Sequence, residues 1–288
     1  MARLTISLFG TFRVLLDGVP ITGFTSKKAQ ALFAYLVVED RLHSREELTG
    51  LFWPEYPEPS ARTSLRNALA NVRSVIGDRH TASPCLAVTR QTIRFNLTSD
   101  CAVDITPFAT PAVTSATTAP SITQLIAALD SVQGPLLMGF SLADSPPFEE
   151  WLLLRREYYH RQIGVAFQRV THYHEEQGAY GQALAMAQRW LNWDTWQEEA
   201  HQQVIKLLAD TGQRNEALLH YERCRELLRT ELGVEPADEI TQLYQKIRSG
   251  RYRRRASFDA VASPPRRLVQ PLTPLVGREE ELTVLHRL

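Results

Sequence analysis

The stretch 60–77, SARTSLRNALANVRSVIG, repeats apolar residues at the spacing of a helix. The apolar positions fall at offsets of 4, 7 and 11 from the first, so they share one helical face. These positions are Leu65, Leu69, Val72 and Ile76. Ser60 can accept hydrogen bonds from the first free backbone N–H groups, and Gly77 ends the run. The pattern therefore predicts a helix over 60–77.

The opposite face of this helix carries small polar and basic residues and no acid. A solvated helix face usually mixes Glu with Lys, so this composition is unusual. Arg is suited to guanine, Asn to adenine, and Ala or Thr to the thymine methyl in a DNA major groove. The candidate base-reading residues are Thr63, Arg66, Asn67, Ala70 and Asn71. An ordinary amphipathic surface helix is the alternative if this helix is taken alone.

Strict alternation of apolar and polar residues near the N-terminus predicts a small antiparallel sheet. The predicted strands cover 4–8, 12–16 and 19–21. Asp17-Gly18 separates the last two strands and is a strong signal for a tight hairpin turn.

Two helices are predicted between the sheet and the stretch 60–77. Ser26 is suited to cap the first, whose apolar residues keep helical spacing to Val37. The run Ser44-Arg45-Glu46-Glu47 reads as a capping box that opens a second, shorter helix. Pro54 stops this helix.

A hairpin is predicted after the stretch 60–77, because apolar residues alternate on both sides of the turn Thr89-Arg90-Gln91. The order of strands, three helices and a hairpin is that of a winged helix. In that fold the third helix enters the major groove and the hairpin reaches flanking backbone. The arginines placed for phosphate contacts are Arg62, Arg73, Arg90 and Arg94.

Residues 3–97 resemble the effector domain of response regulators, which carries an extra N-terminal sheet. The stretches 26–48 and 65–69 (LRNAL) are especially similar to the antibiotic-regulatory-protein (SARP) branch. The resemblance implies that the loop between the second and third helices touches RNA polymerase. That loop contains Trp53, Glu55 and Glu58, and DNA phosphate would repel its two acids.

A repeat marks the second half of the chain. Gly178-x4-Ala183-Leu184 is matched 34 residues later by Gly212-x4-Ala217-Leu218, which is the tetratricopeptide period. Helices are predicted over 122–132 and 148–177, and the segment 106–121, rich in Pro, Ala, Ser and Thr, is predicted to be a loop.

This second half resembles the bacterial transcriptional activator domain. The stretches that carry the resemblance are Val103-Asp104, 133–137 (QGPLL), 212–218 (GQRNEAL) and 231–236 (ELGVEP). The family usually looks helical at 106–121, so the chain departs from the family there. The resemblance implies a transcriptional activator whose helical repeats contact other proteins.

The net charge of zero hides a division along the chain. Residues 1–98 hold 12 Lys and Arg against 8 Asp and Glu, residues 99–248 hold 12 against 20, and residues 249–288 hold 8 against 4. The three regions therefore carry +4, −8 and +4, which suggests separate tasks. No apolar run approaches a membrane span and no signal peptide opens the chain, so we expect a cytoplasmic protein with no membrane partner.

Candidate chemistry is sparse. The sequence contains no GxSxG, HExxH, CxxC or GxGxxG pattern, so we expect no enzyme, no cofactor and no metal. His172 and His174 stand two residues apart on different sides of one helix, which disfavours a shared metal. The three cysteines are expected to be reduced and buried, and the tryptophans at 190, 193 and 196 to fill a repeat core.

Basic runs at 251–255 and 263–267 predict a flexible linker near the C-terminus. The stretch 274–282, PLVGREEEL, then resembles the opening of a signal-transduction ATPase domain. The phosphate-cradling GxxxxGK[ST] loop does not follow before Leu288, so we expect no ATP binding here. Either a truncated chain or a decayed larger ancestor accounts for this pattern.

The sequence as a whole predicts a mainly α protein with a small β part: a winged helix over 1–99, an all-α tetratricopeptide-like domain over 100–250, and a tail over 251–288. The predicted function is a DNA-binding transcriptional activator whose repeats serve self-association or contacts with RNA polymerase. Its predicted partner is double-stranded DNA with direct-repeat sites. Two alternatives stay open: a protein-interaction scaffold, and the N-terminal fragment of a regulatory ATPase.

Overall fold

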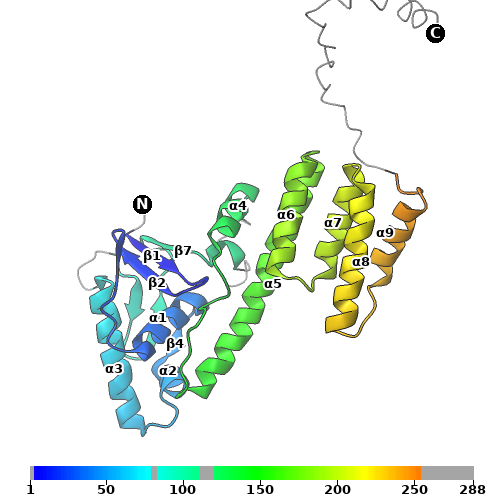
Figure 1. The fold of residues 1–288 in the computed structure, drawn as a ribbon. Helices are drawn as coiled ribbons and strands as arrows, with labels where there is room; N and C mark the ends of the chain where they lie inside the picture. The colour runs from blue at the N-terminus through cyan, green and yellow to red at the C-terminus, as the bar shows by residue number, and fades with distance from the viewer. Residues whose placement is uncertain (1–2, 79–82, 110–119, 254–288) are drawn as a thin grey trace, which may run out of the picture.

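Two arrays of helices flank one long helix in the computed structural model, with a small sheet covering the N-terminal array (Figure 1). The structure describes residues 3–78, 83–109 and 120–253. The predicted ATPase-like stretch and most of the basic tail lie outside these ranges. We call residues 3–109, as far as described, the head, and the helices of 180–248 the repeats.

The N-terminal sheet contains the three predicted strands and a fourth strand that was not predicted. β1 (Leu4–Ser7), β2 (Arg13–Leu16) and β3 (Val19–Pro20) are antiparallel. Asp17 and Gly18 both have positive φ, 50° and 81°, so the predicted tight hairpin turn is confirmed. β7 (Cys101–Val103) lies parallel to β1, so these residues belong to the head sheet and the domain division at 99 does not follow the fold.

Asp104 fastens the end of this fourth strand. Its Oδ2 accepts hydrogen bonds from the backbone N–H groups of Leu8 and Phe9, at 2.8 and 2.9 Å. Burial raises the pKa of the Asp104 carboxyl to about 6, and the backbone hydrogen bonds oppose this shift.

The first two helices of the head begin at the predicted caps. α1 (Lys27–Glu39) starts after Ser26, whose side chain accepts from the Ala29 N–H at 3.1 Å, and α2 (Arg45–Phe52) starts after Ser44. Only half of the predicted capping box forms at α2. The Glu47 carboxylate turns instead to the Arg41 guanidinium and to the His43 ring, whose Nδ1 lies 3.2 Å from Glu47 Oε1.

α3 (Glu58–Val75) is the predicted central helix, but its start was predicted too late. It follows Pro57, and Ser60 lies within its first turn and does not cap it. A proline in a first turn costs no hydrogen bond, since the first N–H groups have no helical partner, so the proline-rich loop runs directly into the helix. Gly77, at φ 68°, ends the run as predicted, and its carbonyl accepts from Arg3 at 3.0 Å.

The predicted hairpin follows α3 and gains a third strand. β5 (Leu86–Val88) and β6 (Thr92–Phe95) are antiparallel, and the short β4 (His43–Ser44) before α2 pairs with β6. The hairpin is thereby joined to α1 and α2, which completes a winged helix. We call the hairpin the wing.

Helices make up the second half. A 3-10 turn (Thr106–Phe108) opens the segment predicted to be a loop, residues 110–119 lie outside the described ranges, and Ser121 caps the next helix in a complete capping box with Gln124. The helices are α4 (Ile122–Ser131), α5 (Pro146–Glu176), α6 (Tyr180–Trp193), α7 (Glu198–Asp210), α8 (Arg214–Glu231) and α9 (Asp238–Arg248).

The predicted repeat is confirmed. Gly178 and Gly212 have φ of 70° and 85° and end α5 and α7, so they make the turns into α6 and α8. Ala183 and Ala217, the matched small residues, are fully buried where the helices meet. The structure is a winged helix followed by tetratricopeptide-like repeats.

The predictions for the cysteines and tryptophans are confirmed in part. All three cysteines are free; Cys85 and Cys224 are buried and Cys101 is half-buried in β7. Trp190 is buried as predicted, but Trp196 is 43% exposed, because it lies in the turn between α6 and α7 and not on a helix face.

α5 belongs to both halves of the molecule. Its N-terminal half packs on α2 of the head, where Phe148 and Leu152 are fully buried, and its C-terminal half packs on α6 (Figure 1). One hydrophobic core therefore extends from the head sheet through α4 and α5 to Trp190, and a second core fills the space between α6, α7, α8 and α9.

Candidate nucleic-acid interface

The two faces of α3 differ as the sequence predicts. The four apolar residues of the predicted stripe are buried: Leu65, Leu69, Val72 and Ile76. On the opposite side Thr63, Arg66 and Asn67 are exposed, and Ala70 is half-buried. Glu58, in the first turn, is the one acid in the helix, so the face from Thr63 to Ala70 is free of acids.

Some side chains of this face already form hydrogen bonds within the protein, and others extend into solvent. The Thr63 hydroxyl donates to the Pro59 carbonyl at 2.9 Å, so it is used within the helix. Arg66 and Asn67 extend from the middle of the helix into solvent. A guanidinium and an amide at adjacent exposed positions offer forked donors, and the amide adds an acceptor.

Asn71, by contrast, is used within the fold. Its side-chain oxygen accepts from the Thr25 N–H at 3.0 Å, and its side-chain nitrogen donates to the Gly23 carbonyl at 3.1 Å. The amide thus fixes the segment before α1 against α3. We therefore give Asn71 the task of holding α3 in place and leave it out of the base-reading set.

Arg90 occupies the tip of the wing and is exposed. Arg45, at the start of α2, supports this tip, since its guanidinium donates to the Thr89 carbonyl at 2.9 Å and its N–H donates to Gln91 at 3.1 Å. Arg45 was not among the residues that the sequence predicts for the DNA-binding site. The only signal was its position directly after a helix cap, because the contact with the wing spans 44 residues.

The other predicted phosphate-binding arginines have acidic neighbours. Arg62 pairs with Glu58 on the surface, and such exposed pairs are weak. Arg73 lies 3.6 Å from the buried Asp78 carboxylate, and Arg94 lies 3.4 Å from Asp40. Burial raises the pKa of the Asp40 carboxyl, and Arg94 opposes that shift. Arg94 thus has a structural partner, which weakens its candidacy for DNA.

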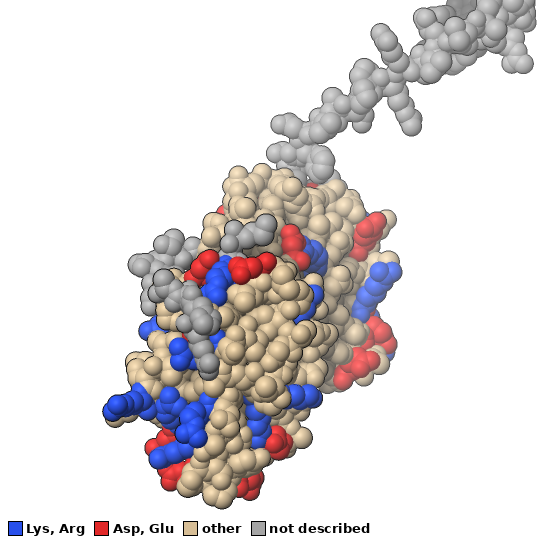
Figure 2. All heavy atoms as spheres, turned by 90° about the vertical axis from the view of Figure 1, so that its left-hand side faces the viewer, with Lys and Arg blue, Asp and Glu red and all other residues tan. Residues whose placement is uncertain are grey.

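The side of the molecule that carries α3 faces the viewer in Figure 2. Lys and Arg side chains gather on the lower part of this side, and Asp and Glu side chains lie along its lower edge (Figure 2). A concentrated positive region next to an acid-free helix face is the electrostatic footprint expected of a DNA-binding surface.

The loop between α2 and α3 corrects one prediction. Trp53 is only 6% exposed, because its ring packs on Phe52, so it is not available for contact with a partner surface. Glu55 and Glu58 are exposed. The acids of the loop are therefore accessible and its tryptophan is part of the core.

A buried polar cluster ties α1 to α5. Glu39, 7% exposed at the end of α1, accepts from the Arg155 guanidinium at 2.6 and 2.8 Å and from Trp151 Nε1 at 2.6 Å. Close pairing with a carboxylate raises the pKa of Arg155 although burial acts to lower it. The head and α5 therefore hold a fixed geometry at this contact.

Within the described ranges no helix is long and apolar enough to cross a membrane. The same residues contain no group of three or more His, Cys, Asp or Glu side chains that could hold a metal ion. His172 pairs with Glu176, at 3.1 Å.

The fold places the chain among winged-helix proteins that carry a helical repeat domain. Residues 109–248 match the model of the bacterial transcriptional activator domain family, which is just under half of the chain. In its domain make-up the chain is similar to SARP-like transcriptional regulators.

The relatives agree with this assignment. The chain is similar to the transcriptional regulatory protein EmbR of Mycobacterium tuberculosis and to that of Mycobacterium bovis. Each is 28% identical to this chain over 75 residues, which span 26% of this chain and 19% of the relative. The solved structure of Mycobacterium tuberculosis EmbR, in complex with a low-affinity phosphopeptide, superposes with a TM-score of 0.66 at 23% identity. It covers 87% of this chain and 66% of EmbR, and shows that the fold is shared.

Proposed function

We propose that the chain is a sequence-specific DNA-binding transcriptional regulator that acts as an activator. α3 enters the major groove and the wing contacts the flanking backbone. The observation that carries the proposal is the exposed, acid-free face of α3 between Thr63 and Ala70, beside the basic wing.

The side chains divide into two roles. Arg66 reads guanine and Asn67 reads adenine, while the methyl groups of Thr63 and Ala70 contact thymine. Arg62 and Arg90 bind phosphates, because both are exposed at the edges of the face and neither has a buried partner in the described residues.

Activation requires a contact beyond DNA. Glu55, in the loop before α3, and Glu58, in its first turn, are exposed and are repelled by phosphate, so they suit a protein partner, which we propose is RNA polymerase. Replacing both by Ala is expected to leave DNA affinity unchanged and to lower transcription. Equal losses in both assays would indicate misfolding and contradict this role.

The acidic repeats suit protein contacts better than DNA. A single winged helix buries roughly 600–1,000 Å² on DNA, which is little for strong discrimination. We propose that two copies bind direct repeats and associate through their repeats, which raises the effective concentration at the second site. Gel-shift titrations on one and two half-sites would show cooperative binding only for the pair; identical curves would leave the repeats without this role.

The primary test combines selection of bound sequences from random DNA with a double substitution. Arg66→Ala with Asn67→Ala is expected to cost about 1–3 kcal/mol per lost base contact and to relax specificity. Arg161→Ala with Asn192→Ala removes the same groups from exposed positions on α5 and α6 and serves as the control. Unchanged binding by the first variant would remove α3 as the reading helix.

A further inference from the structure

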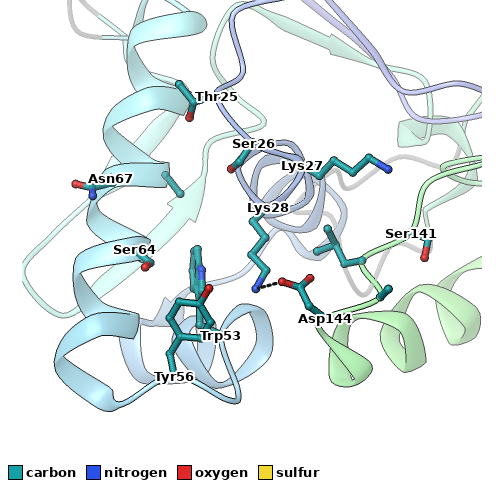
Figure 3. Close-up of a pocket in the computed structure, with 13 residues that line it drawn as sticks. Thr25, Ser26, Lys27, Lys28, Trp53, Tyr56, Ser64, Asn67, Ser141 and Asp144 are labelled. Carbon is teal, nitrogen blue, oxygen red and sulfur yellow. Dashed lines mark ion pairs between the residues drawn. The ribbon is translucent and has the colours of Figure 1, made fainter.

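A cleft of about 740 Å³ lies beside the reading face and shares Asn67 with the DNA contacts proposed above (Figure 3). Four segments line it: the start of α1, the loop between α2 and α3, the middle of α3, and residues 141–144 before α5. The volume falls within the range of roughly 300–1,000 Å³ typical of small-molecule sites. The cleft therefore joins the DNA-reading helix to the activator domain.

Lys28 places a positive charge inside this cleft. Its side chain is 13% exposed, and its ammonium group lies 5.7 and 5.3 Å from the ring centroids of Trp53 and Tyr56. Aromatic faces at this distance attract a cation and hold it in place. Figure 3 shows the ammonium directed across the cleft toward Asp144. The cleft thus holds a fixed, largely desolvated cation.

The partner of this cation is held much less firmly. Asp144 lies 2.8 Å from the Lys28 ammonium, but its side chain is 66% exposed, in contrast to the 13% of Lys28. A carboxylate that remains mostly in water loses little by leaving an ion pair. A negatively charged group from outside can therefore take its place, while Asp144 returns to solvent.

The surroundings of the cation favour a flat apolar group next to that negative charge. Tyr56 is 48% exposed at the edge of the cleft, so its ring offers a free face for stacking. Ser64 of α3 supplies a hydroxyl group on the other side (Figure 3). An aromatic surface, a cation and a few polar groups converging on one cavity are the usual composition of a ligand site.

We propose that this cleft binds a small organic anion in which an aromatic ring carries a carboxylate or phosphate. The anionic group replaces Asp144 beside the Lys28 ammonium, and the ring stacks on Tyr56. A small molecule is the proposed occupant, because the volume and the mixture of aromatic, charged and polar lining groups are those of a small-molecule site.

A bound anion has a consequence for DNA that rests on the proposed function. Asn67 lines the cleft and belongs to the proposed base-reading set. If α3 enters the major groove as proposed, a negative charge beside Asn67 repels any DNA phosphate that comes within a Debye length of it, about 8–10 Å. The ligand is therefore expected to weaken DNA binding, and the cleft serves as an effector site.

The test uses the full chain and three probes: benzoate, phenyl phosphate and indole-3-acetate, the first and last each matched by its neutral amide. Calorimetry at millimolar probe is expected to detect binding of at least one anion, with the neutral amide at least tenfold weaker. Lys28→Met is expected to weaken binding at least tenfold, and Lys28→Arg to retain most of it. Lys246→Met, which removes an exposed cation from α9, serves as the control and is expected to bind as the unmodified chain does.

The decisive variant is Asp144→Asn. It removes the internal competitor for Lys28, so the anion is expected to bind several-fold more tightly, whereas a carboxylate that itself held the ligand would give a loss. No charge-selective binding, or no gain in Asp144→Asn with an unchanged melting temperature, would overturn the proposal. A Lys28→Met variant that loses DNA affinity without any probe binding would assign Lys28 to DNA phosphate and overturn it as well.

Gel shifts with saturating probe then test the coupling separately. The probe is expected to lower DNA affinity, and unchanged affinity would overturn the effector role. If the probes bind as expected and the chain binds no DNA, the proposed function fails while the anion site stands.

Discussion

The head and the repeats bury their amphipathic helices in different ways. Each helix of the repeats packs against its neighbours in the sequence, α6 on α5, α7 on α6, and α8 on α7. The head instead closes its core with distant segments: β7 pairs with β1, and Arg155 of α5 reaches Glu39 across 116 residues. The winged helix therefore shares its core with α4 and α5, whereas the repeats are added to α5 one pair at a time.

The largest predicted effect comes from ending the chain after Ser99. This truncation removes β7, the fully buried Phe148 and Leu152, and the two partners that α5 supplies to Glu39. Burying two such side chains alone stabilises a fold by roughly 3–6 kcal/mol, a large part of a typical stability of 5–15 kcal/mol. We expect residues 1–99 to lack cooperative unfolding in urea, as followed by circular dichroism.

The matched truncation ends the chain after Glu231 and removes α9, which contacts α7 and α8. We expect the head to unfold at an unchanged urea midpoint in this shortened chain. A head of residues 1–99 that unfolds cooperatively at the midpoint of the full chain would remove the contrast between the two regions.

This contrast explains what the sequence revealed. Local patterns predicted the cap at Ser26, the turn at Asp17-Gly18 and the glycine-marked repeat, because periodicity and turn chemistry act within a few residues. β7 was missed because three residues, Cys101–Val103, carry too short an alternation to distinguish a strand. Pairing with β1 depends on contacts across nearly a hundred residues, which no local window contains.

At the candidate site, too, local patterns did not predict contacts between residues distant in the sequence. Helical spacing separated the buried stripe of α3 from its exposed face correctly. It did not reveal that Asn71 is held by Gly23 and Thr25, or that Trp53 is buried. Both facts depend on which segment packs against the helix, and the sequence pattern of α3 alone contains no information about that neighbour.

A smaller effect is expected from breaking the polar tie between α1 and α5. Arg155→Met leaves the buried Glu39 carboxylate with only the more distant Arg41, at 3.9 Å, as a charge partner, which should destabilise the chain by about 3 kcal/mol. Arg229→Met removes an arginine of the repeats whose pair with Glu226 is exposed on both sides, and should cost under about 1 kcal/mol. Urea midpoints of the two variants check the difference; equal costs would show that the tie does not stabilise the head.

The stability of the repeats is expected to depend on pH. His220 Nε2 lies 3.1 Å from His201 Nδ1, and burial lowers the pKa of His220 to about 4, with His201 and Arg223 adding to the shift. The unfolded chain binds the proton near pH 6.5, so stability contributed by neutral His220 is complete above that pH and is lost as pH falls toward 4.

We expect this loss to reach about 1–3 kcal/mol between pH 6.5 and 4. His220→Gln keeps a donor near His201 and does not titrate, so urea midpoints of this variant should change less over the same range. Parallel pH curves for the two proteins would exclude His220 as the cause.

The smallest predicted effect is on the salt dependence of DNA binding. Arg90→Ala in the wing should reduce the dependence of log K on log salt by about one phosphate contact, a slope change of roughly 0.9. Arg223→Ala, an exposed arginine of the acidic repeats, should leave the slope unchanged. A similar change of the salt slope in both variants would mean that the repeats contact DNA as well as the head.

The most direct test of the central claim asks whether α3 reads base edges in the major groove. Each adenine of the selected site is replaced in turn by 7-deazaadenine, which lacks the N7 acceptor to which an asparagine amide donates. At one position the unmodified chain should lose about 1–3 kcal/mol of binding free energy, and Asn67→Ala should lose nothing further there. Equal losses for the two proteins at every position would contradict the assignment of α3 as the reading helix.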